Sequence, residues 1–325
     1  MTSAAFDVLG IGNAIVDVIS HADDAFLAKH SLNKGSMTLI DEARAETLYA
    51  AMGPGIEMSG GSCGNTMAGV ASFGGKGAYI GKVRNDQLGA VFAHDMRATG
   101  VAFDTPLASS GPATARCLIV VTPDAQRTMN TYLGACTGLG PADIEPEIVG
   151  GAQVTYVEGY LWDAPEAKKA VLKAFDAAHA AGRLVSITLS DSFCVDRYRD
   201  EFRALIRGKV DILFGNESEI KSLYQVDSFE SALEATRREA KVAALTRSEK
   251  GSVVVMGGET HAVAAMPVAK VIDTTGAGDL YAAGFLHGFT HGKPLPECAR
   301  LGGIAAAEVI SHVGARPEKP LRELV

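Results

Sequence analysis

The sequence lacks the features that mark secreted, membrane-spanning or nucleic-acid-binding proteins. Its five cysteines form no CxxC pair and are odd in number, which argues against a disulfide framework or a zinc site and favours reduced thiols. No uninterrupted apolar stretch reaches the roughly 18 residues that suggest a membrane span. Lysines and arginines form no run, and the formal net charge is -8. We therefore expect neither a membrane nor a nucleic acid as a partner.

Low-complexity tracts, internal repeats and linkers rich in proline, glycine or serine are also missing. The first residues, Met1–Phe6, lack the basic start and apolar core of a signal peptide, so a cytoplasmic protein is expected. With 47% hydrophobic and 21% charged residues, the composition is that of a globular protein. The length allows one large domain or two ordinary ones. Because no boundary is visible, we predict a single α/β domain over residues 1–325.

What the chain does contain is an alternation of apolar runs and alanine-rich stretches. Pro165–Ala181 and Ser228–Ala240 have helical spacing of their apolar residues. Strands that alternate with such helices predict an α/β fold with a mostly parallel central sheet covered by helices on both faces. The apolar runs interpreted as strands are Phe6–Ile11, Gly77–Val83, Arg116–Thr122, Val154–Glu158, Leu184–Leu189, Val210–Phe214, Val242–Thr246 and Ser252–Met256.

Two segments interrupt this alternation. Residues 36–40 and 113–132 have the pattern of strands with polar residues between apolar ones, and Pro123-Asp124 marks a hairpin turn in the second. An inserted hairpin in an α/β chain often forms a lid or an oligomer contact, and a plain edge hairpin is the alternative. We predict a small β lid built from these two segments.

The strongest chemical signal is the run Asp273–Asp279 (DTTGAGD), which is followed by helical spacing over Leu280–His287. Its glycines allow a tight turn and a close approach to a ligand, and the N–H groups at the helix start suit phosphate. Phosphate would repel the carboxylate of Asp279, so this residue needs a task there. Accepting a proton from an attacking hydroxyl is the obvious one. A glycine turn capped by an aspartate is the alternative.

Two other nucleotide-binding motifs fail. Gly10-x-Gly12 opens like a dinucleotide fingerprint, but Ile15 stands where the third glycine belongs. The sequence also contains no GxxxxGK[ST] phosphate loop. The anion site is therefore assigned to the run that ends at Asp279.

This run resembles the carboxy-terminal signature of the PfkB, or ribokinase-like, carbohydrate kinases. Gly60–Asn65 (GGSCGN), followed by Gly81 and Gly89, resembles the amino-terminal signature of that family, and Phe214–Glu219 (FGNESE) resembles its NxxE element. The likeness extends over nearly the whole chain. It implies a ribokinase-like fold, ATP as the phosphoryl donor and Mg²⁺ as a cofactor.

Within the family, the sequence is most similar to the adenosine kinases. Leu9–Asn13 with Asp17 resembles their first strand and turn, and Ile187–Phe193 (ITLSDSF) resembles another of their segments. Val210–Glu219 is nearly their sequence at that site, and the tail Arg316–Pro320 is also similar to theirs. The likeness implies a nucleoside as the acceptor.

The resemblance implies a substrate site between the first strand and turn and the glycine-rich anion hole. Asp17 would hold two neighbouring ribose hydroxyls, because one carboxylate can accept from both. Asp279 would take the proton of the 5′-hydroxyl, while the N–H groups of Gly276, Ala277 and Gly278 would stabilise the transferring phosphoryl group. Ordinary turn or cap roles are the alternative for several of these residues. The residues expected to complete the sugar site are Asn13, Gly60, Gly61, Ser62 and Asn65.

The resemblance also implies sites for ATP and metal ions. Glu219, with Asn216, would organise Mg²⁺ through water, since Mg²⁺ keeps part of its hydration shell. A solvated helix start is the alternative for this pair. Asp273 is a candidate for binding a monovalent cation such as K⁺. The expected contacts of ATP and its phosphates are Arg127, Asn216, Thr246 and Thr275.

Some positions depart from the family pattern. Ser248 replaces the middle glycine of the Thr-x-Gly-x-x-Gly element at the ATP site, so this loop is expected to sit differently. Leu161 replaces one ring of an aromatic pair in the base pocket, and a core position is the alternative for its neighbour Trp162. The apolar contacts expected for the base are Met37, Leu39, Met129, Leu161 and Trp162.

Three functions remain open on the sequence alone. The first is ATP-dependent phosphorylation of a nucleoside 5′-hydroxyl, with adenosine as acceptor and AMP as product. The second is a sugar kinase that acts on ribose, fructose or a related sugar. The third is a non-catalytic sensor, which Asp279 disfavours because a sensor needs no base beside an anion site. A monomer and a homodimer are both compatible with the sequence.

Overall fold

The computed structural model describes residues 4–124 and 126–325. Ala125, inside the predicted lid segment, and the first three residues of the chain lie outside the described part.

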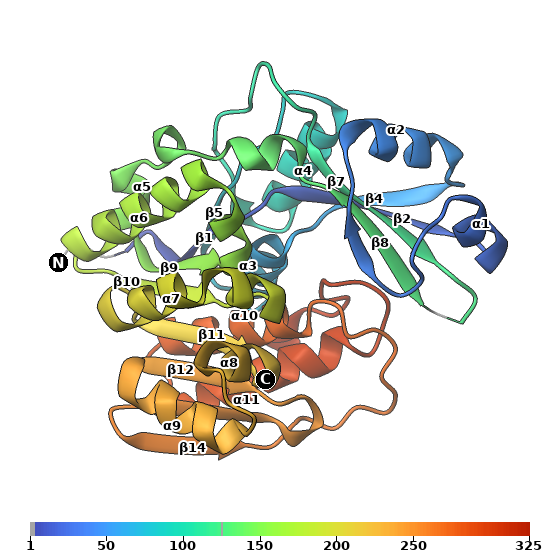
Figure 1. Ribbon diagram of the computed structural model, residues 1–325. Helices are drawn as coiled ribbons and strands as arrows, with labels where there is room; N and C mark the ends of the chain where they lie inside the picture. Colours follow the sequence, from blue (N-terminus) through green and yellow to red (C-terminus); the bar gives the residue numbers. More distant parts are fainter. Residues whose placement is uncertain (1–3, 125) are drawn as a thin grey trace.

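A nine-stranded sheet forms the centre of the molecule (Figure 1). Its strands are β1 (Phe6–Ile11), β5 (Gly77–Ile80), β6 (Val101–Ala102), β9 (Ala152–Glu158), β10 (Leu184–Thr188), β11 (Ile212–Asn216), β12 (Val242–Thr246), β13 (Ser252–Met256) and β14 (Glu259–Val263). They follow the order β14-β13-β12-β11-β10-β9-β1-β5-β6. The pairs from β6 to β12 are parallel, and only β13 and β14 run antiparallel to their neighbours. Parallel strands that are buried on both faces explain the continuous apolar runs.

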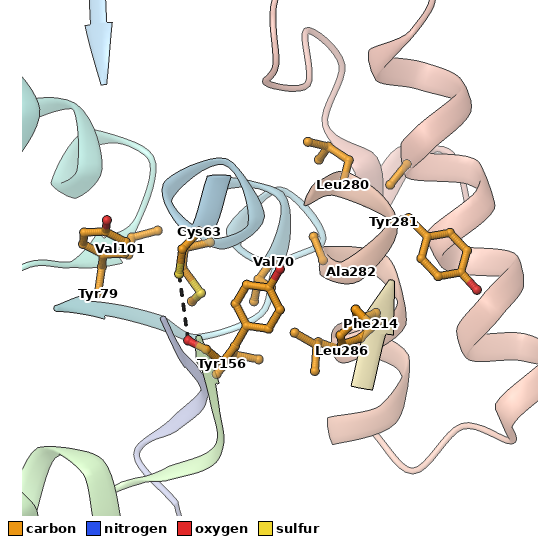
Figure 2. Packing of buried hydrophobic residues seen from close by; sticks show 14 of the residues in the cluster. Cys63, Val70, Tyr79, Val101, Tyr156, Phe214, Leu280, Tyr281, Ala282 and Leu286 are labelled. Atoms are coloured by element: carbon orange, nitrogen blue, oxygen red, sulfur yellow. Dashed lines mark hydrogen bonds between the residues drawn. The ribbon is translucent and has the colours of Figure 1, made fainter. Parts of the chain in front are cut away.

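Helices cover both faces of this sheet. One face carries α3 (Ser62–Ser72), α4 (Gln87–Ala98), α10 (Ala277–Thr290) and α11 (Leu295–Val309). The other carries α5 (Pro146–Gly150), α6 (Pro165–Ala180), α7 (Ser192–Gly208), α8 (Glu217–Tyr224) and α9 (Phe229–Glu239). Figure 2 shows α3 and α10 meeting side chains of β9 and β11 in one cluster. The predicted α/β fold is confirmed. Across the described part of the chain, no helix has the length and apolar character to cross a membrane.

A second, five-stranded sheet stands beside the first (Figure 1). Its order is β3-β8-β7-β2-β4, with β2 (Ile15–His21), β3 (Met37–Leu39), β4 (Gly55–Ser59), β7 (Ala115–Val121) and β8 (Arg127–Tyr132). The helices α1 (Asp24–Lys29) and α2 (Glu42–Ala51) belong to the same part of the chain. Both predicted lid segments contribute strands to this sheet. The sequence analysis missed β2 and β4, which supply its other edge.

Candidate active site

The carboxyl ends of β1, β9, β10, β11 and β12 meet along one edge of the large sheet, because these strands are parallel. Ligands of open α/β sheets bind outside this edge. Asn13, Glu158 and Asn216 lie directly at the ends of three of these strands. The small sheet lies beside the same edge, since Arg127 of β8 pairs with Asp273 and the charge of Asp279 raises the pKa of Asp17 on β2; the space between the two sheets is called the cleft below.

Asp279 lies in the first turn of α10, where two helices begin. Ser62 Oγ donates to its Oδ1 at 2.6 Å, and Asn65 Nδ2 donates to its Oδ2 at 3.1 Å. Both donors belong to the first turn of α3. The helix α10 starts at Gly276, whose φ of 78° favours glycine. The carboxylate is therefore fixed by neutral donors beside the positive ends of two helices.

Burial raises the pKa of Asp279 to about 6, and the hydrogen bonds from Ser62 and Asn65 oppose that shift. A carboxylate with such a pKa is a stronger base than an ordinary aspartate and is still ionised at neutral pH. Asp279 keeps part of its surface accessible, so a hydroxyl group can reach it.

The start of α10 leaves room for an anion. The N–H groups of a first helical turn have no intrahelical acceptor and point toward such a ligand. A Cβ added to Gly278 would meet no protein atom within 4 Å, so the space beside this residue is open to a ligand. Gly276, Ala277 and Gly278 lie at this helix start, and their role as an anion hole stays a prediction.

Asp17 lies in the middle of β2, on the small sheet, and not at a helix cap. A Cβ on Gly60 would come within 2.4 Å of Asp17 Oδ2, so glycine makes room for the carboxylate. Gly61 begins α3 with a φ of 81°, and a Cβ there would come within 2.4 Å of the Asn13 carbonyl oxygen. Burial raises the pKa of Asp17 to about 6, while the positive charges of Arg127 and Arg316 oppose the shift.

Asp17 belongs to a row of side chains that crosses one face of the small sheet. Directly paired residues of neighbouring strands share a face. The row is Met58, Asp17, Cys117, Thr131 and Leu39, and the next row on the same face is Ile56, Ile19, Ile119, Met129 and Met37. A cavity of about 250 Å³ opens at the Leu39 end, with Ile40, Tyr132 and Leu133 among its walls. The three predicted lid contacts, Met37, Leu39 and Met129, therefore share a largely apolar surface with Asp17.

Leu161 and Trp162 do not join this surface. Both are buried among the helices on the opposite face of the large sheet, at 1% and 2% exposure, and Trp162 Nε1 donates to Glu201 Oε2 at 2.8 Å. Their position corrects the expectation that they contact the base. Their neighbour Tyr160 stays partly exposed, and its pKa is raised by burial and by the charges of nearby acids, Asp279 among them.

Glu158, at the end of β9, is a site residue that the sequence analysis missed. Its Oε1 accepts from Asn13 N and its Oε2 from Cys63 N, both at 2.9 Å. One buried carboxylate thus joins the turn after β1 to the first turn of α3. Burial raises its pKa to about 7. An isolated glutamate at the end of an apolar run has no sequence signal that separates it from a surface residue.

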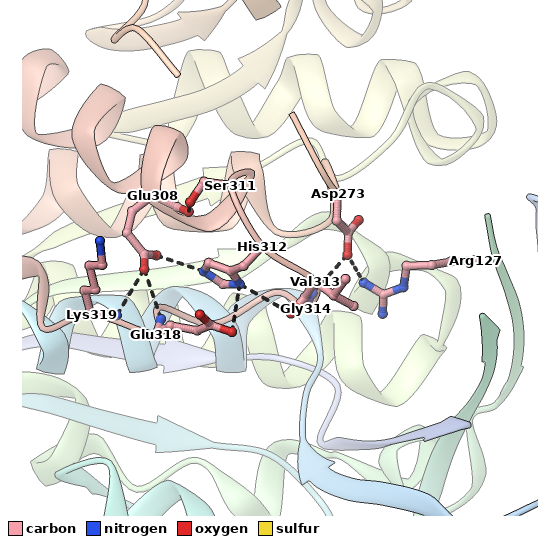
Figure 3. A network of polar contacts seen from close by, with 9 residues as sticks. All are labelled: Arg127, Asp273, Glu308, Ser311, His312, Val313, Gly314, Glu318 and Lys319. Carbon is pink, nitrogen blue, oxygen red and sulfur yellow. Dashed lines mark hydrogen bonds and ion pairs between the residues drawn. The ribbon is translucent and has the colours of Figure 1, made fainter. Parts of the chain in front are cut away.

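Arg127 and Asp273 connect the small sheet to the predicted anion hole. They form a buried ion pair, and Gly314 N also donates to Asp273 Oδ2 at 3.0 Å (Figure 3). Thr275 donates to Asp273 Oδ1 through N at 2.9 Å and through Oγ1 at 2.7 Å. A carboxylate offers about four lone-pair sites, and these four donors occupy them. Asp273 therefore has no vacant site for the expected monovalent cation.

A groove of about 450 Å³ lies at the ends of β11 and β12, and Asn216 and Thr246 line it. Its walls carry both charges: Lys221, Arg247 and Lys250 are positive, and Glu217, which pairs with Arg247 at 2.9 Å, and Glu249 are negative. Ser248 has a φ of 51°, the left-handed conformation that favours glycine. The groove thus brings together two of the residues expected to contact ATP.

Asn216 and Glu219 form a reciprocal cap at the start of α8. Asn216 Oδ1 accepts from Glu219 N at 2.9 Å, and Glu219 Oε2 accepts from Asn216 N at 2.9 Å. Burial raises the pKa of Glu219 to about 7, and the negative charges of Asp191 and Asp279 add to the shift. A nearby cation would offset this charge. Among the described residues, no group of three or more His, Cys, Asp or Glu side chains forms a direct metal site.

Residues 54–322 match the model of the pfkB family of carbohydrate kinases. The chain belongs to this family. Its members are phosphotransferases that act on an alcohol group. Two solved structures are each 55% identical, with a TM-score of 0.92 and coverage of 99% of this chain and 98% of theirs: an adenosine kinase from Sinorhizobium meliloti and a probable sugar kinase protein from Rhizobium etli CFN 42. Adenosine kinase 1 of Arabidopsis thaliana is 27% identical over 98% of this chain and 99% of its own length.

Proposed function

We propose that this pfkB-family kinase transfers the γ-phosphoryl group of ATP to the 5′-hydroxyl of adenosine, which yields AMP and ADP. The observation that carries the proposal is the placement of two carboxylates in one cleft. Asp17 lies on an apolar wall suited to a nucleoside, and Asp279 lies at a helix start suited to phosphate. The similarity to the Sinorhizobium meliloti adenosine kinase supports the choice of acceptor.

In the proposed reaction, Asp279 accepts the proton of the 5′-hydroxyl. The hydroxyl oxygen then forms a bond to the γ-phosphorus, and the bond from that phosphorus to the β–γ bridging oxygen breaks. ADP leaves with the electron pair. The N–H groups at the start of α10 and the Arg127 guanidinium stabilise the charge on the transferring group, which is the main source of catalysis in such transfers. Arg127 Nε is buried without a hydrogen-bond partner among the described residues, which leaves one donor of this guanidinium unsatisfied.

The groove beside Thr246 and Asn216 is the proposed site of ATP. Mg²⁺ would neutralise part of the phosphate charge when it is bound. Burial raises the pKa of Glu219, and a cation bound nearby would stabilise its ionised form and lower that pKa again. Its oxygens already accept from Asn216, so contact with Mg²⁺ through water suits it better than direct ligation. K⁺ is not assigned to Asp273, because protein donors occupy that carboxylate.

The proposed adenosine site combines Asp17 with the apolar face of the small sheet. Asp17 would accept from the 2′- and 3′-hydroxyls, and the cavity lined by Leu39, Tyr132 and Leu133 would receive the base. We further propose that the whole chain acts as one kinase domain and that the five-stranded sheet is its lid. The protein would act in the cytoplasm, where its buried, free cysteines stay reduced.

An assay of ADP formation with a panel of acceptors tests this proposal. Adenosine should have a higher kcat/KM than ribose or fructose. The preference for adenosine over 2′-deoxyadenosine should be at least about tenfold, because a lost hydrogen bond to a charged group costs about 1.5–3 kcal/mol. Asp17→Ala should remove most of that preference. The family also contains sugar kinases, and ready turnover of ribose or fructose without turnover of adenosine would support that second function instead.

A further inference from the structure

The segment after α11 returns to the active site with three consecutive residues. Gly314 N donates to Asp273 Oδ2. Ala315 packs against Gly276, where an added Cβ would lie 2.9 Å from Ala315. Arg316 Nε donates to Asn65 Oδ1 at 3.4 Å. This short segment thus contacts Gly276 of the predicted anion hole, the neighbouring Asp273, and Asn65 at the start of α3, whose amide donates to Asp279.

Glu308, near the end of α11, holds the base of this segment (Figure 3). Its Oε1 accepts from Glu318 N at 3.1 Å and from Lys319 N at 3.0 Å, and its Oε2 lies 3.2 Å from His312 Nε2. The carboxylate is 8% exposed. Both ends of the segment are therefore tied to one buried group, which limits the positions open to Arg316.

The Arg316 guanidinium is enclosed between α3 and α4. Besides Asn65, it contacts Met96 Sδ through Nη2 at 3.6 Å. Burial lowers its pKa, while the charges of Asp17 and Asp95 oppose the shift. The Arg316 side chain is partly buried, and its charge is compensated by the nearby acids Asp17 and Asp95 and by the Asn65 amide oxygen.

The amide of Asn65 connects Arg316 to Asp279. Arginine only donates hydrogen bonds, and an ionised carboxylate only accepts them, whereas an amide can present either end. With the guanidinium at Oδ1, the amide must present Nδ2 to Asp279, as observed. If Asp279 became protonated, a free amide could turn and accept from it, which would stabilise the protonated acid. The guanidinium opposes that turn.

We propose that Arg316 is a positioning residue for phosphoryl transfer, which holds the Asn65 amide so that Asp279 stays ready to accept a proton. Arg316 need not touch the acceptor to do this. Arg316 acts on Asp279 indirectly, through the Asn65 amide, since the direct influences on the pKa of Asp279 are burial, Ser62 and Asn65. The inference rests on the proposed function and adds the group that sets the protonation state of its base.

The test is the pH dependence of kcat at saturating adenosine in Arg316→Gln and Arg316→Lys, because kcat/KM would also report Asp17, whose pKa the charge of Arg316 lowers. Glutamine is similar in length but can accept as well as donate, so it no longer fixes the amide. In Arg316→Gln, the midpoint of the acidic limb of the pH profile should move up by roughly one pH unit, the scale of a lost charge-assisted contact. Lysine donates only, and its profile should return toward that of the wild type. Arg300→Gln, which removes a charge paired with Glu297 on α11, should leave the profile unchanged.

A second comparison tests the route through the amide. In an Asn65→Leu background, Arg316→Gln should shift the acidic limb much less than it does alone. An equal shift in both backgrounds, or identical profiles for the glutamine and lysine variants, would overturn the inference. A lower melting temperature with an unmoved limb would show a purely structural role. Failure of the wild type to phosphorylate adenosine would instead refute the proposed function.

Discussion

At the scale of single residues, two partly buried carboxylates have different surroundings and so different proposed tasks. Asp17 faces the charges of Arg127 and Arg316, while Asp279 accepts only from the neutral donors Ser62 and Asn65. Burial raises the pKa of both to about 6. A carboxylate beside cations suits the binding of hydroxyls, and one held by neutral donors at a phosphate site suits proton transfer.

The raised pKa of Asp279 predicts the acidic side of the pH profile. A base works only when it is ionised. Since burial raises the pKa of both Asp279 and Asp17 to about 6, kcat/KM for adenosine should be largely retained at pH 7 and should fall by up to about a hundredfold per pH unit well below 6, whereas kcat at saturating adenosine should fall about tenfold per pH unit. Direct measurement of ADP between pH 4.5 and 8 checks this, with stability at each pH as the control. A midpoint near 4, the ordinary value for aspartate, would contradict it.

The sequence revealed those site residues that belong to a motif. Asp279, Ser62 and Asn65 meet because two glycine-rich signatures each begin a helix, and both signatures are visible as patterns. Glu158 lies in no pattern, and its role arises only when β9 ends beside α3. Leu161 and Trp162 were misplaced because neighbouring residues of the short 3-10 helix Gly159–Asp163 point in different directions, which spacing alone does not resolve.

At the scale of elements, glycines shape the walls of the cleft. Gly60 separates β4 from α3 and leaves no room for a Cβ beside Asp17. Gly60→Ala should therefore fold but displace the Asp17 carboxylate. KM for adenosine should rise about tenfold or more, the cost of weakened hydrogen bonds to a charged group, and the preference over 2′-deoxyadenosine should shrink.

Gly208→Ala is the matched control for this substitution. It lies at the end of α7, where an added Cβ would meet no protein atom within 4 Å. Its KM should equal that of the wild type. Similar adenosine KM values for the two alanine variants would contradict the role assigned to Gly60.

The loop after β12 holds a residue with a Cβ in a conformation that favours glycine. Ser248, which stands where the family pattern has glycine, adopts the left-handed conformation with a φ of 51°, and the different placement expected for this loop stays a prediction. A residue with a Cβ pays about 1–2 kcal/mol for that conformation. Ser248→Gly should therefore raise the free energy of unfolding by about 0.5 kcal/mol, once the greater freedom of unfolded glycine is subtracted.

Glu249→Gly, in the 3-10 turn Ser248–Lys250 of the same loop, is the control. It lacks a positive φ, so glycine there should lower the free energy of unfolding by roughly 0.5–1 kcal/mol. Urea unfolding of the two variants measures both values. Destabilisation of equal size in both would show that Ser248 carries no strain.

At the scale of the whole molecule, the large sheet was predictable except for its edge strands β6 and β14, and the small sheet only in part. Continuous apolar runs mark β9 to β13 because strands buried on both faces need them. β2 escaped notice because it follows β1 after only three residues and because Asp17 interrupts its apolar pattern. Asp17 thus places a carboxylate on the cleft wall. The apolar pattern that identifies a strand is therefore broken at a residue with a proposed function.

The central claim is that Asp279 is the base that activates the acceptor hydroxyl. The most direct test measures kcat for adenosine and the Kd of adenosine in Asp279→Asn, which keeps the shape of the side chain and removes its charge. The account predicts a loss of at least about 10²-fold in kcat, the scale of a lost general base, with a Kd close to that of the wild type. Near-normal turnover in that variant would contradict it and would reduce Asp279 to a helix-start residue.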